Sequence, residues 1–483
     1  MSKENQKTKE ILTCFEELSK VPRSSKNEAK IRSWLQDWAR KNSFESKADK
    51  AGNLVIKVPA TKGYEKAPTV VLQGHLDMVC EKTPDSKHDF SKDPIKFVYD
   101  GEWLRADKTT LGADNGIAIA MAMVAATDKG IVHPPLELLF TVDEETGLTG
   151  ANALEPGFIN GKYLLNLDSE DEGTFTVGCA GGLNTISTFP LEFENLPSGF
   201  KCAKINAGGM KGGHSGVDIH RWRANAIVVL GRAIANLTQK VDLRIADIVG
   251  GSAHNAIPRD STATVIVRDG DYDKAVKLLA EFEKTVKREF KNTDPELALT
   301  IKPESNTPQK VLTANSTKKT VNVILAMPHG VAAMSTDIEK LVETSNNFAN
   351  IKIENQKLNI LTSQRSSLPS RLSCISEKIG AFAKVAGGDS VNEGGYPPWP
   401  VNMDSPLLAK CTNLYEKKFG KKPVVEAIHA GLECGIIGDK YEGMDMISFG
   451  PTMKNVHSPD EKLHVPSIEK VWDFTVELLG SFK

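Results

Sequence analysis

Apolar residues recur at helical spacing near both ends of the chain and form short continuous runs between them. The helical spacing predicts amphipathic helices over residues 5–19 and 27–41, the second capped by Ser25 or Asn27. Continuous Val, Leu and Ile runs are typical of strands that are buried on both faces. Such runs occupy residues 53–58, 69–73, 136–141 and 162–167. With an Ala- and Met-rich helix over 116–127 between them, they predict an α/β fold whose sheet is mixed, mostly parallel and flanked by helices.

The pattern changes after Cys179, where helices and strand pairs indicate an inserted α+β domain. Its predicted helices cover 223–240, 272–291, 318–326 and 370–385, and its predicted strand pairs join 243–249 to 262–267 and 351–353 to 358–361. Residues 387–400 are rich in Gly and Pro, which predicts a linker back to the first domain. Helices over 405–419 and 467–481 follow. We therefore expect a first domain formed by residues 1–185 and 390–483, with residues 186–389 inserted into it.

Length and charge limit the classes of partner. The chain has 483 residues, long enough for two or three domains, and a formal net charge of -2. Such a balanced charge does not favour nucleic acid or an anionic membrane as a partner. Residues 1–7 contain no apolar signal segment, and no run reaches the roughly 18 apolar residues of a membrane span. Seven scattered cysteines without a C-x-x-C pair favour a reducing, cytoplasmic compartment.

Histidines and acids follow the predicted strands, at the sheet edge where open α/β folds bind ligands. His75 and Asp77 stand two residues apart, so they face the same side of an extended chain. The other positions are Asp114 between glycines, the acidic run Asp143–Glu145, Asp168, and His457 in a polar turn. Each position also has a structural explanation on its own: a surface turn, a helix cap, a solvated helix start, or an acid ending a strand.

The coincidence of these positions is more specific than any one of them. Three consecutive acids repel one another unless cations lie nearby. Together with two histidines they supply mixed nitrogen and oxygen ligands, which suit zinc, manganese or cobalt better than calcium. Five ligands with one bridging carboxylate would hold two metal ions roughly 3.5–4 Å apart.

The order of motifs resembles a known family. In chain order they are H-L-D-M-V, G-A-D-N-G, D-E-E-T-G, D-S-E-x-E-G, G-C-A-G-G, K-G-G-H-S-G, H-N-A-I-P-R, H-A-G-L-E-C-G and H-S-P-D-E. They resemble the motifs of the aminoacyl-histidine dipeptidases of the M20 metallopeptidases, from about Ile11 to the C-terminus. The resemblance implies a catalytic domain of the zinc-peptidase type, with residues 186–389 as its lid.

The resemblance also implies roles for single residues. His75, Asp114 and Asp168 would hold one metal ion, and Asp114, Glu145 and His457 the other. Asp77 would orient His75, and Glu144 would be the general base toward a water that bridges the metals. His214 in the lid would stabilise the oxyanion, and Asn255 and Gly431 would bind substrate. For Gly431 an ordinary turn glycine is an equal alternative.

The implied reaction is hydrolysis of unblocked dipeptides, with Xaa-His, including beta-alanyl-histidine, as the best-resembled substrate. The implied cofactors are two divalent ions, zinc before cobalt or manganese, and the implied assembly is a homodimer. An aminopeptidase, an N-acyl amino acid amidohydrolase or an inactive peptide- or metal-binding homologue would share the same residues. His88, His133, His329 and Cys80 are interpreted as structural.

Overall fold

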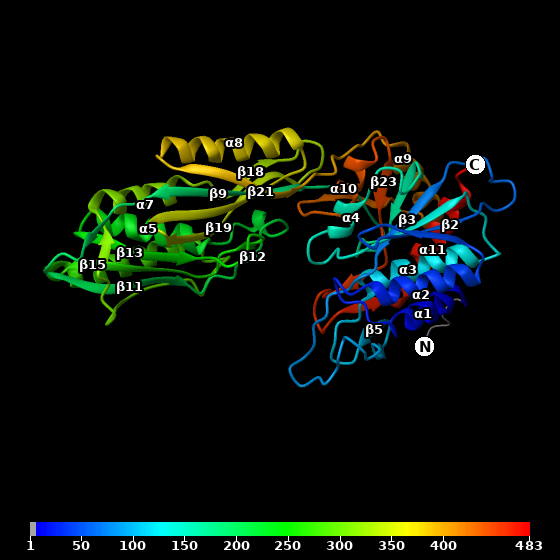
Figure 1. Cartoon of the computed structure of the whole chain (residues 1–483), viewed down its shortest axis with the longest axis horizontal. Helices are drawn as coiled ribbons and strands as arrows, with labels where there is room; N and C mark the ends of the chain where they lie inside the picture. Colours follow the sequence, from blue (N-terminus) through cyan, green and yellow to red (C-terminus); the bar gives the residue numbers. More distant parts are fainter. Residues whose placement is uncertain (1–5) are drawn as a thin grey trace. The chain divides into compact units, whose positions relative to one another are not determined.

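The computed structural model describes residues 6–483, which divide into two compact units (Figure 1). Unit 1 runs to Cys179 and resumes over Trp399–Ala427 and Leu432–Lys483, while unit 2 comprises Ala180–Pro398 and Ile428–Gly431. The α/β fold class is confirmed, with a mixed, helix-flanked sheet and an inserted α+β domain. The expected domain boundaries at 185/186 and 389/390 stay predictions, while the two compact units divide at 179/180 and 398/399.

Unit 1 is built on an eight-stranded sheet in the order β1-β2-β6-β3-β7-β23-β8-β22. Its strands are β1 (Glu45–Ala48), β2 (Leu54–Val58), β3 (Val70–His75), β6 (Leu136–Thr141), β7 (Tyr163–Asn166), β8 (Thr174–Cys179), β22 (Val424–Ile428) and β23 (Asp445–Ser448). The parallel pairings lie in the centre, where β3 joins β6 and β7, and β7 joins β23. Every residue of β3 and β6 is buried, as the continuous apolar runs predict.

Seven helices belong to unit 1 within the described residues. They are α1 (Gln6–Leu18), α2 (Ala29–Lys41), α3 (Ala113–Thr127), α4 (Thr149–Ala153), α9 (Pro406–Phe419), α10 (Glu433–Lys440) and α11 (Val465–Gly480). The small residues of α3 bring it close to β3 and α1, and almost the whole helix is buried. A core of aromatic rings supports α11, where the centroids of Phe449 and Phe474 lie 5.1 Å apart. A small second sheet has the order β24-β25-β5-β4, formed by Met453–Lys454, Lys462–His464, Trp103–Ala106 and Phe97–Asp100.

Unit 2 contains a nine-stranded antiparallel sheet in the order β16-β11-β15-β13-β19-β20-β9-β21, with β18 paired to β19. Its strands are β9 (Gly181–Pro190), β11 (Phe200–Gly208), β13 (Leu243–Gly250), β15 (Ser261–Arg268), β16 (Ala298–Pro303), β18 (Gly330–Met334), β19 (Val342–Glu354), β20 (Lys357–Ser366) and β21 (Asp389–Tyr396). The helices are α5 (Ala226–Thr238), α6 (Tyr272–Glu289), α7 (Ala314–Ala326) and α8 (Pro369–Val385), and all four contact the sheet. Short pairs add β10 (Phe193–Asn195) with β17 (Lys310–Leu312) and β12 (Gly213–His214) with β14 (Ala256–Ile257).

Two local predictions are wrong. The predicted linker over 387–400 contains β21, an edge strand paired with β9, and a register shift between Glu393 and Gly395 accommodates the glycines. The predicted cap of α2 is also absent. Helix α2 has Glu28 at its N-cap with no side-chain cap hydrogen bond, and Ser25 donates its hydroxyl to Asp77 instead.

Two further observations bear on the class of protein. All seven cysteines lie within the described residues and are free. In the part of the chain from residue 6 onward, no helix is long and apolar enough to cross a membrane.

Candidate metal centre

His75 is the last residue of β3, and Asp77 lies beside it. The His75 Nδ1 atom is 3.3 Å from Asp77 Oδ1 and 3.2 Å from the Asp77 carbonyl oxygen. The Asp77 carboxylate also accepts hydrogen bonds from the Ser25 hydroxyl at 2.8 Å and from the backbone amides of Glu144 and Glu145 at 3.0 and 3.2 Å. Asp77 therefore connects the His75 ring to the segment that follows β6.

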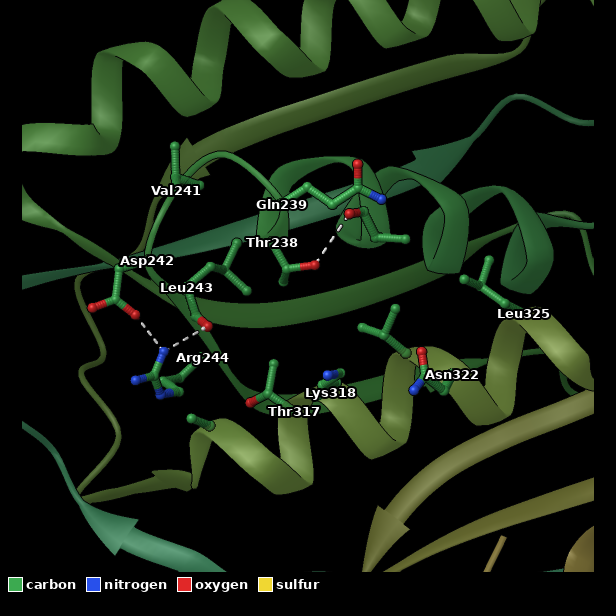
Figure 2. A pocket seen from close by; sticks show the side chains of 13 residues that line it. Thr238, Gln239, Val241, Asp242, Leu243, Arg244, Thr317, Lys318, Asn322 and Leu325 are labelled. Atoms are coloured by element: carbon green, nitrogen blue, oxygen red, sulfur yellow. Dashed lines mark hydrogen bonds and ion pairs between the residues drawn. The ribbon is translucent and has the colours of Figure 1, made fainter. Parts of the chain in front are cut away.

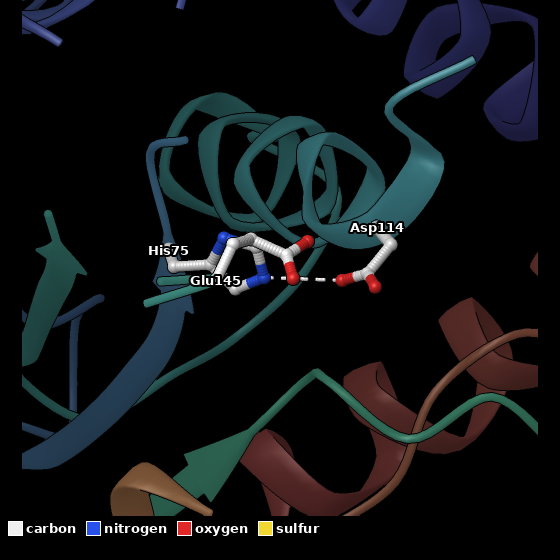
Figure 3. Close-up of side chains that lie close together, drawn as sticks. All are labelled: His75, Asp114 and Glu145. Carbon is white, nitrogen blue, oxygen red and sulfur yellow. Dashed lines mark hydrogen bonds and ion pairs between the residues drawn. The ribbon is translucent and has the colours of Figure 1, made fainter. Parts of the chain in front are cut away.

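Asp114 lies between two histidines (Figure 3 shows its contact with His75). Its Oδ1 is 3.0 Å from His75 Nε2, and its Oδ2 is 3.1 Å from His457 Nε2. The turn before α3 places it there: Gly112 has a left-handed φ of 69°, and Asp114 itself has non-helical angles. The helix-cap explanation of Asp114 is wrong, because α3 has no side-chain cap bond and Asp114 directs one oxygen at each histidine.

Glu145 and Asp168 complete the cluster. Glu145 Oε2 is 2.9 Å from His457 Nε2, and Asp168 Oδ1 is 3.6 Å from His75 Nε2. The other oxygen of Glu145 is buried and has no hydrogen-bond partner among the described residues. The structure thus gathers His75, Asp114, Glu145, Asp168 and His457, which come from five separate segments of unit 1.

The charged groups of this cluster shift one another's pKa values. Burial lowers the pKa of His75, but Asp168, Asp114 and Asp77 outweigh it and raise that pKa well above its ordinary value. Hydrogen bonds to Asp114 and Glu145 raise the pKa of His457 to about 11. Burial raises the pKa of Asp168 to about 6. The carboxylates of the cluster thus favour positive charge at the positions of both histidine rings.

The three consecutive acids, Asp143 to Glu145, have different surroundings. Asp143 has a left-handed φ of 51° and accepts hydrogen bonds from the hydroxyls of Thr146 and Thr149, both at 2.5 Å, so it builds the turn. Glu145 joins the cluster. The Glu144 carboxylate has no hydrogen bond among residues 6–483, and burial together with the nearby acids Asp168, Glu433 and Glu145 raises its pKa well above the ordinary value.

The donor set fits a divalent metal. One ligand atom each from His75, Asp114 and Glu145 lies within 4.8 Å of the others. The unpartnered Glu145 oxygen is the kind of buried polar atom that a cation would satisfy, and nitrogen with carboxylate oxygen is the ligand chemistry of zinc and its neighbours. A second buried group, Glu28, Asp77 and Asp143, is also close together, but hydrogen bonds from backbone amides and hydroxyls already occupy its carboxylates.

The other three predicted site residues all lie in unit 2. His214 pairs with Ala256 where β12 meets β14, and the Asn255 carbonyl accepts the Ser215 amide at 2.8 Å. The His214 Nδ1 atom accepts the amides of Gly216 and Val217 at 3.3 and 3.2 Å. Nδ1 is therefore an acceptor, and the ring proton belongs on Nε2. Burial, with the nearby Arg365, lowers the pKa of His214 to about 4, so the ring is neutral near pH 7.

Gly431 lies against Tyr396, also within unit 2. A Cβ atom at this position would come within 2.6 Å of the Tyr396 ring, so a larger residue would collide with it. The Tyr396 hydroxyl accepts a hydrogen bond from Arg365 at 2.5 Å, and Arg365 is buried. Gly431 belongs to the segment Ile428–Gly431 that returns to this unit.

A groove elsewhere in unit 2 has a volume of about 530 Å³ (Figure 2). Its walls come from α5, α7 and the start of β13, with Arg244 paired to Asp242 at one end. None of the predicted site residues lines it.

Sequence reasoning missed four residues that support the cluster. Glu461 was quoted in the H-S-P-D-E motif but given no role, and Glu433 was quoted in H-A-G-L-E-C-G. Buried Glu433 accepts hydrogen bonds from Gln73 Nε2 and the Thr141 hydroxyl, both at 2.6 Å. The other two are Arg23, which no motif indicated, and Ser25, which was interpreted only as a helix cap.

Comparisons with known proteins agree with one another. The protein-family model "Peptidase family M20/M25/M40" matches residues 71–481. The chain is 38% identical over 465 residues to the cytosol non-specific dipeptidase of Escherichia coli (strain K12), covering 96% of each chain. Among solved structures, the aminoacylhistidine dipeptidase of Vibrio alginolyticus superposes with a TM-score of 0.89 at 38% identity, over 100% of this chain and 98% of that one. The aminopeptidase PepT of Bacillus cereus, at 18% identity and a TM-score of 0.56, shares the fold.

Proposed function

Because the chain belongs to peptidase family M20/M25/M40, we propose that it is a dimetal-dependent dipeptidase whose centre is the cluster in unit 1. The resemblance to the aminoacyl-histidine dipeptidases is confirmed by the two relatives at 38% identity. One observation carries the proposal. The two oxygens of Asp114 face two different histidines, as expected for a carboxylate that bridges two cations.

The proposed ligands form two sets that share Asp114. His75, Asp114 and Asp168 would hold one ion, and Asp114, Glu145 and His457 the other. Zinc is the first candidate, with cobalt or manganese as alternatives, because all three accept this mixture of imidazole and carboxylate. When bound, two such ions acidify water and polarise the scissile carbonyl.

Glu144 is proposed as the general base, and Asp77 as the residue that orients His75. The backbone of Glu144 is fixed by the Asp77 carboxylate, yet its own carboxylate has no hydrogen bond among the described residues. Bound divalent cations would oppose the burial and the nearby acids that raise its pKa, so the ionised carboxylate could take a proton from the attacking water and deliver it to the leaving amine. The Asp77 carboxylate therefore contacts both the His75 ring and the backbone amide of Glu144.

In unit 2, His214, Asn255 and Gly431 are proposed to bind substrate, with residues 186–389 acting as the lid of the catalytic domain. The neutral His214 ring carries its proton on Nε2, which suits a donor to the oxygen that becomes negative during hydrolysis. Arg365 donates a hydrogen bond to Tyr396, whose ring lies against Gly431. Its positive charge suits the free carboxylate of an unblocked dipeptide. Xaa-His dipeptides, including beta-alanyl-histidine, are the proposed substrates, and a cytoplasmic homodimer is the proposed working form.

A pair of variants tests the proposed division of labour. Glu144→Gln is expected to keep two metal ions per chain while turnover falls by about 10²–10⁴-fold, because only the base is lost. The adjacent Glu145→Gln is expected to lose metal instead. Metal analysis and dipeptide hydrolysis are measured on both proteins. Near-normal turnover in Glu144→Gln would remove this residue as the base.

A substrate panel tests the proposed specificity. The panel contains Xaa-His and other dipeptides, a tripeptide, and an N-acetyl amino acid, each assayed with and without chelator. Dipeptide cleavage that stops with chelator supports the proposal. Cleavage of the tripeptide or the N-acetyl compound with dipeptides untouched would favour an aminopeptidase or an amidohydrolase, and no cleavage in the metal-loaded protein would favour a binding protein.

A further inference from the structure

Glu461 occupies a cage of backbone amides at the start of α3. Its Oε2 accepts the amides of Leu111 at 2.7 Å and Gly112 at 3.0 Å. Its Oε1 accepts those of Ala113 at 2.8 Å and Asp114 at 3.3 Å. The side chain is buried, with 2% of the residue exposed. The turn that presents Asp114 to the two histidines is thus wrapped around one carboxylate.

The same residue belongs to the segment that carries His457. The Glu461 amide donates to the Ser458 carbonyl at 3.0 Å, which closes the turn directly after His457. The His457 backbone has a left-handed φ of 60°, and its ring contacts Asp114 and Glu145. Two metal-facing segments far apart in the sequence are therefore joined at Glu461.

Arg23 holds the opposite side of the turn. Its guanidinium donates to the carbonyl of Gly112, and through Nη1 to the carbonyls of Leu76 at 3.1 Å and Asp77 at 2.8 Å. Arg23 is buried with 2% exposure, and its charge interacts favourably with that of Glu461. The backbone amides of the turn thus face the Glu461 carboxylate, and the Gly112 carbonyl faces the Arg23 guanidinium. Arg23 also contacts the two residues that follow His75.

The cage fits the ionised carboxylate. Burial raises the pKa of Glu461 to about 7, opposed by the hydrogen bonds from the cage. The two carboxylate oxygens of Glu461 are surrounded by four N–H donors. A protonated carboxyl group would add a fifth donor and find no acceptor for its own proton. A glutamine at this position would direct its NH₂ group at two of those N–H donors and leave them without an acceptor.

We propose that Glu461 is a positioning residue of the metal centre, which sets the spacing between Asp114 and His457 by holding their two turns as one unit. The inference rests on the proposed dimetal centre. Groups that hold metal ligands in place typically contribute 10–100-fold to metal affinity. Removing the Glu461 charge should therefore weaken metal binding even though Glu461 is not one of the proposed ligands.

Glu137 supplies a matched control in the same unit. It is buried, lies at the opposite end of β6 from Thr141, and accepts the amides of Asn160 at 2.7 Å and Gly161 at 3.0 Å. Glu137→Gln therefore disturbs a buried, amide-bound carboxylate that contacts no proposed ligand. Any loss of stability common to such variants appears in this control as well.

The experiment compares wild type, Glu461→Gln and Glu137→Gln after metal removal, each titrated with Zn²⁺ at pH 8 against a chromophoric chelator. We expect two ions per wild-type chain, at least one site weakened by about 10–100-fold in Glu461→Gln, and wild-type affinity in Glu137→Gln. Circular dichroism checks that each protein is folded. Wild-type affinity in Glu461→Gln, or an equal loss in Glu137→Gln, would overturn the inference.

Two outcomes need separate treatment. If wild type binds no zinc, the proposed metal centre fails and this inference fails with it, whereas a change limited to Glu461→Gln leaves the centre intact. If Glu461→Gln does not fold, Glu461→Asp replaces it, because aspartate keeps the charge but cannot reach all four amides. Weaker zinc binding in Glu461→Asp then supports the inference, and unchanged binding refutes it.

Discussion

Protonation of His329 is expected to loosen unit 2 in mild acid. Its Nδ1 atom accepts hydrogen bonds from the Asn225 side chain and the Phe348 amide, both at 3.3 Å. Asn225 in turn caps α5 by accepting the amides of Ile227 and Val228. A proton on Nδ1 would place a donor where two donors already point, so protonation disrupts the support of this cap.

The size of the effect follows from the pKa. Burial lowers the pKa of His329 to about 4 from an ordinary value of 6.5. The unfolded chain therefore takes up this proton first as the pH falls. The stabilisation from the neutral ring is complete above about pH 6.5 and is lost progressively down to about pH 4. Between pH 7.5 and 4.5 the loss is about 2.5 kcal/mol, an upper limit because the ring is partly exposed.

Hydrogen exchange of the α5 amides measures this loss. Wild type and His329→Gln are compared at pH 7.5 and 4.5, after correction for the intrinsic exchange rate at each pH. Glutamine does not titrate. If the loss reaches its upper limit of about 2.5 kcal/mol, the fall in protection between pH 7.5 and 4.5 should be about 70-fold smaller in the variant than in wild type. Every other group of unit 2 is the same in both proteins, so its contribution cancels in the comparison. An equal fall in both proteins would refute the role of His329.

Three further perturbations have defined outcomes. Gly251→Ala should destabilise unit 2 by more than about 2 kcal/mol in denaturant unfolding, because φ is +72° and the new Cβ would lie 1.9 Å from the Ala349 carbonyl oxygen; wild-type stability would contradict this. Phe474→Ala should cost unit 1 about 3–5 kcal/mol by calorimetry, and a loss below 1 kcal/mol would mean that the core refills. Asp77→Asn should weaken zinc binding by about 10–100-fold in chelator competition, because His75 loses its carboxylate partner; unchanged affinity would argue against that role.

Apolar runs were sufficient to locate the centre of unit 1. Strands β3 and β6 are buried on both faces, and Val, Leu and Phe fill seven of their twelve positions, so the apolar signal is clear. In unit 2, β19 and β20 were only partly predicted, over 351–353 and 358–361. The missed part of β19 buries Thr344, Ser345, Asn346 and Asn347, whose polar groups bond within the sheet and to neighbouring loops. Hydropathy cannot identify a strand whose buried side chains are polar.

The candidate site was predictable to the extent that its residues carry unusual chemistry. Histidines and acids at strand ends are visible in a sequence, and the structure gathers five of them. Arg23 and Glu461 contact backbone carbonyls and amide N–H groups, which nearly every residue possesses, so no spacing rule indicates their partners. Only the folded chain shows that a turn near residue 112 needs an anion on one side and a cation on the other.

The short segment Ile428–Gly431 has a consequence for recombination between related genes. It belongs to unit 2, where Ala180 donates its amide to the carbonyls of Ile428 and Ala430, both at 3.1 Å, and Ser345 contacts His429 at 2.7 Å. Unit 2 therefore cannot be exchanged as the single interval Ala180–Pro398. A chimaera must carry these four distant codons from the same parent, or both crossover products will join segments that were never selected to fit.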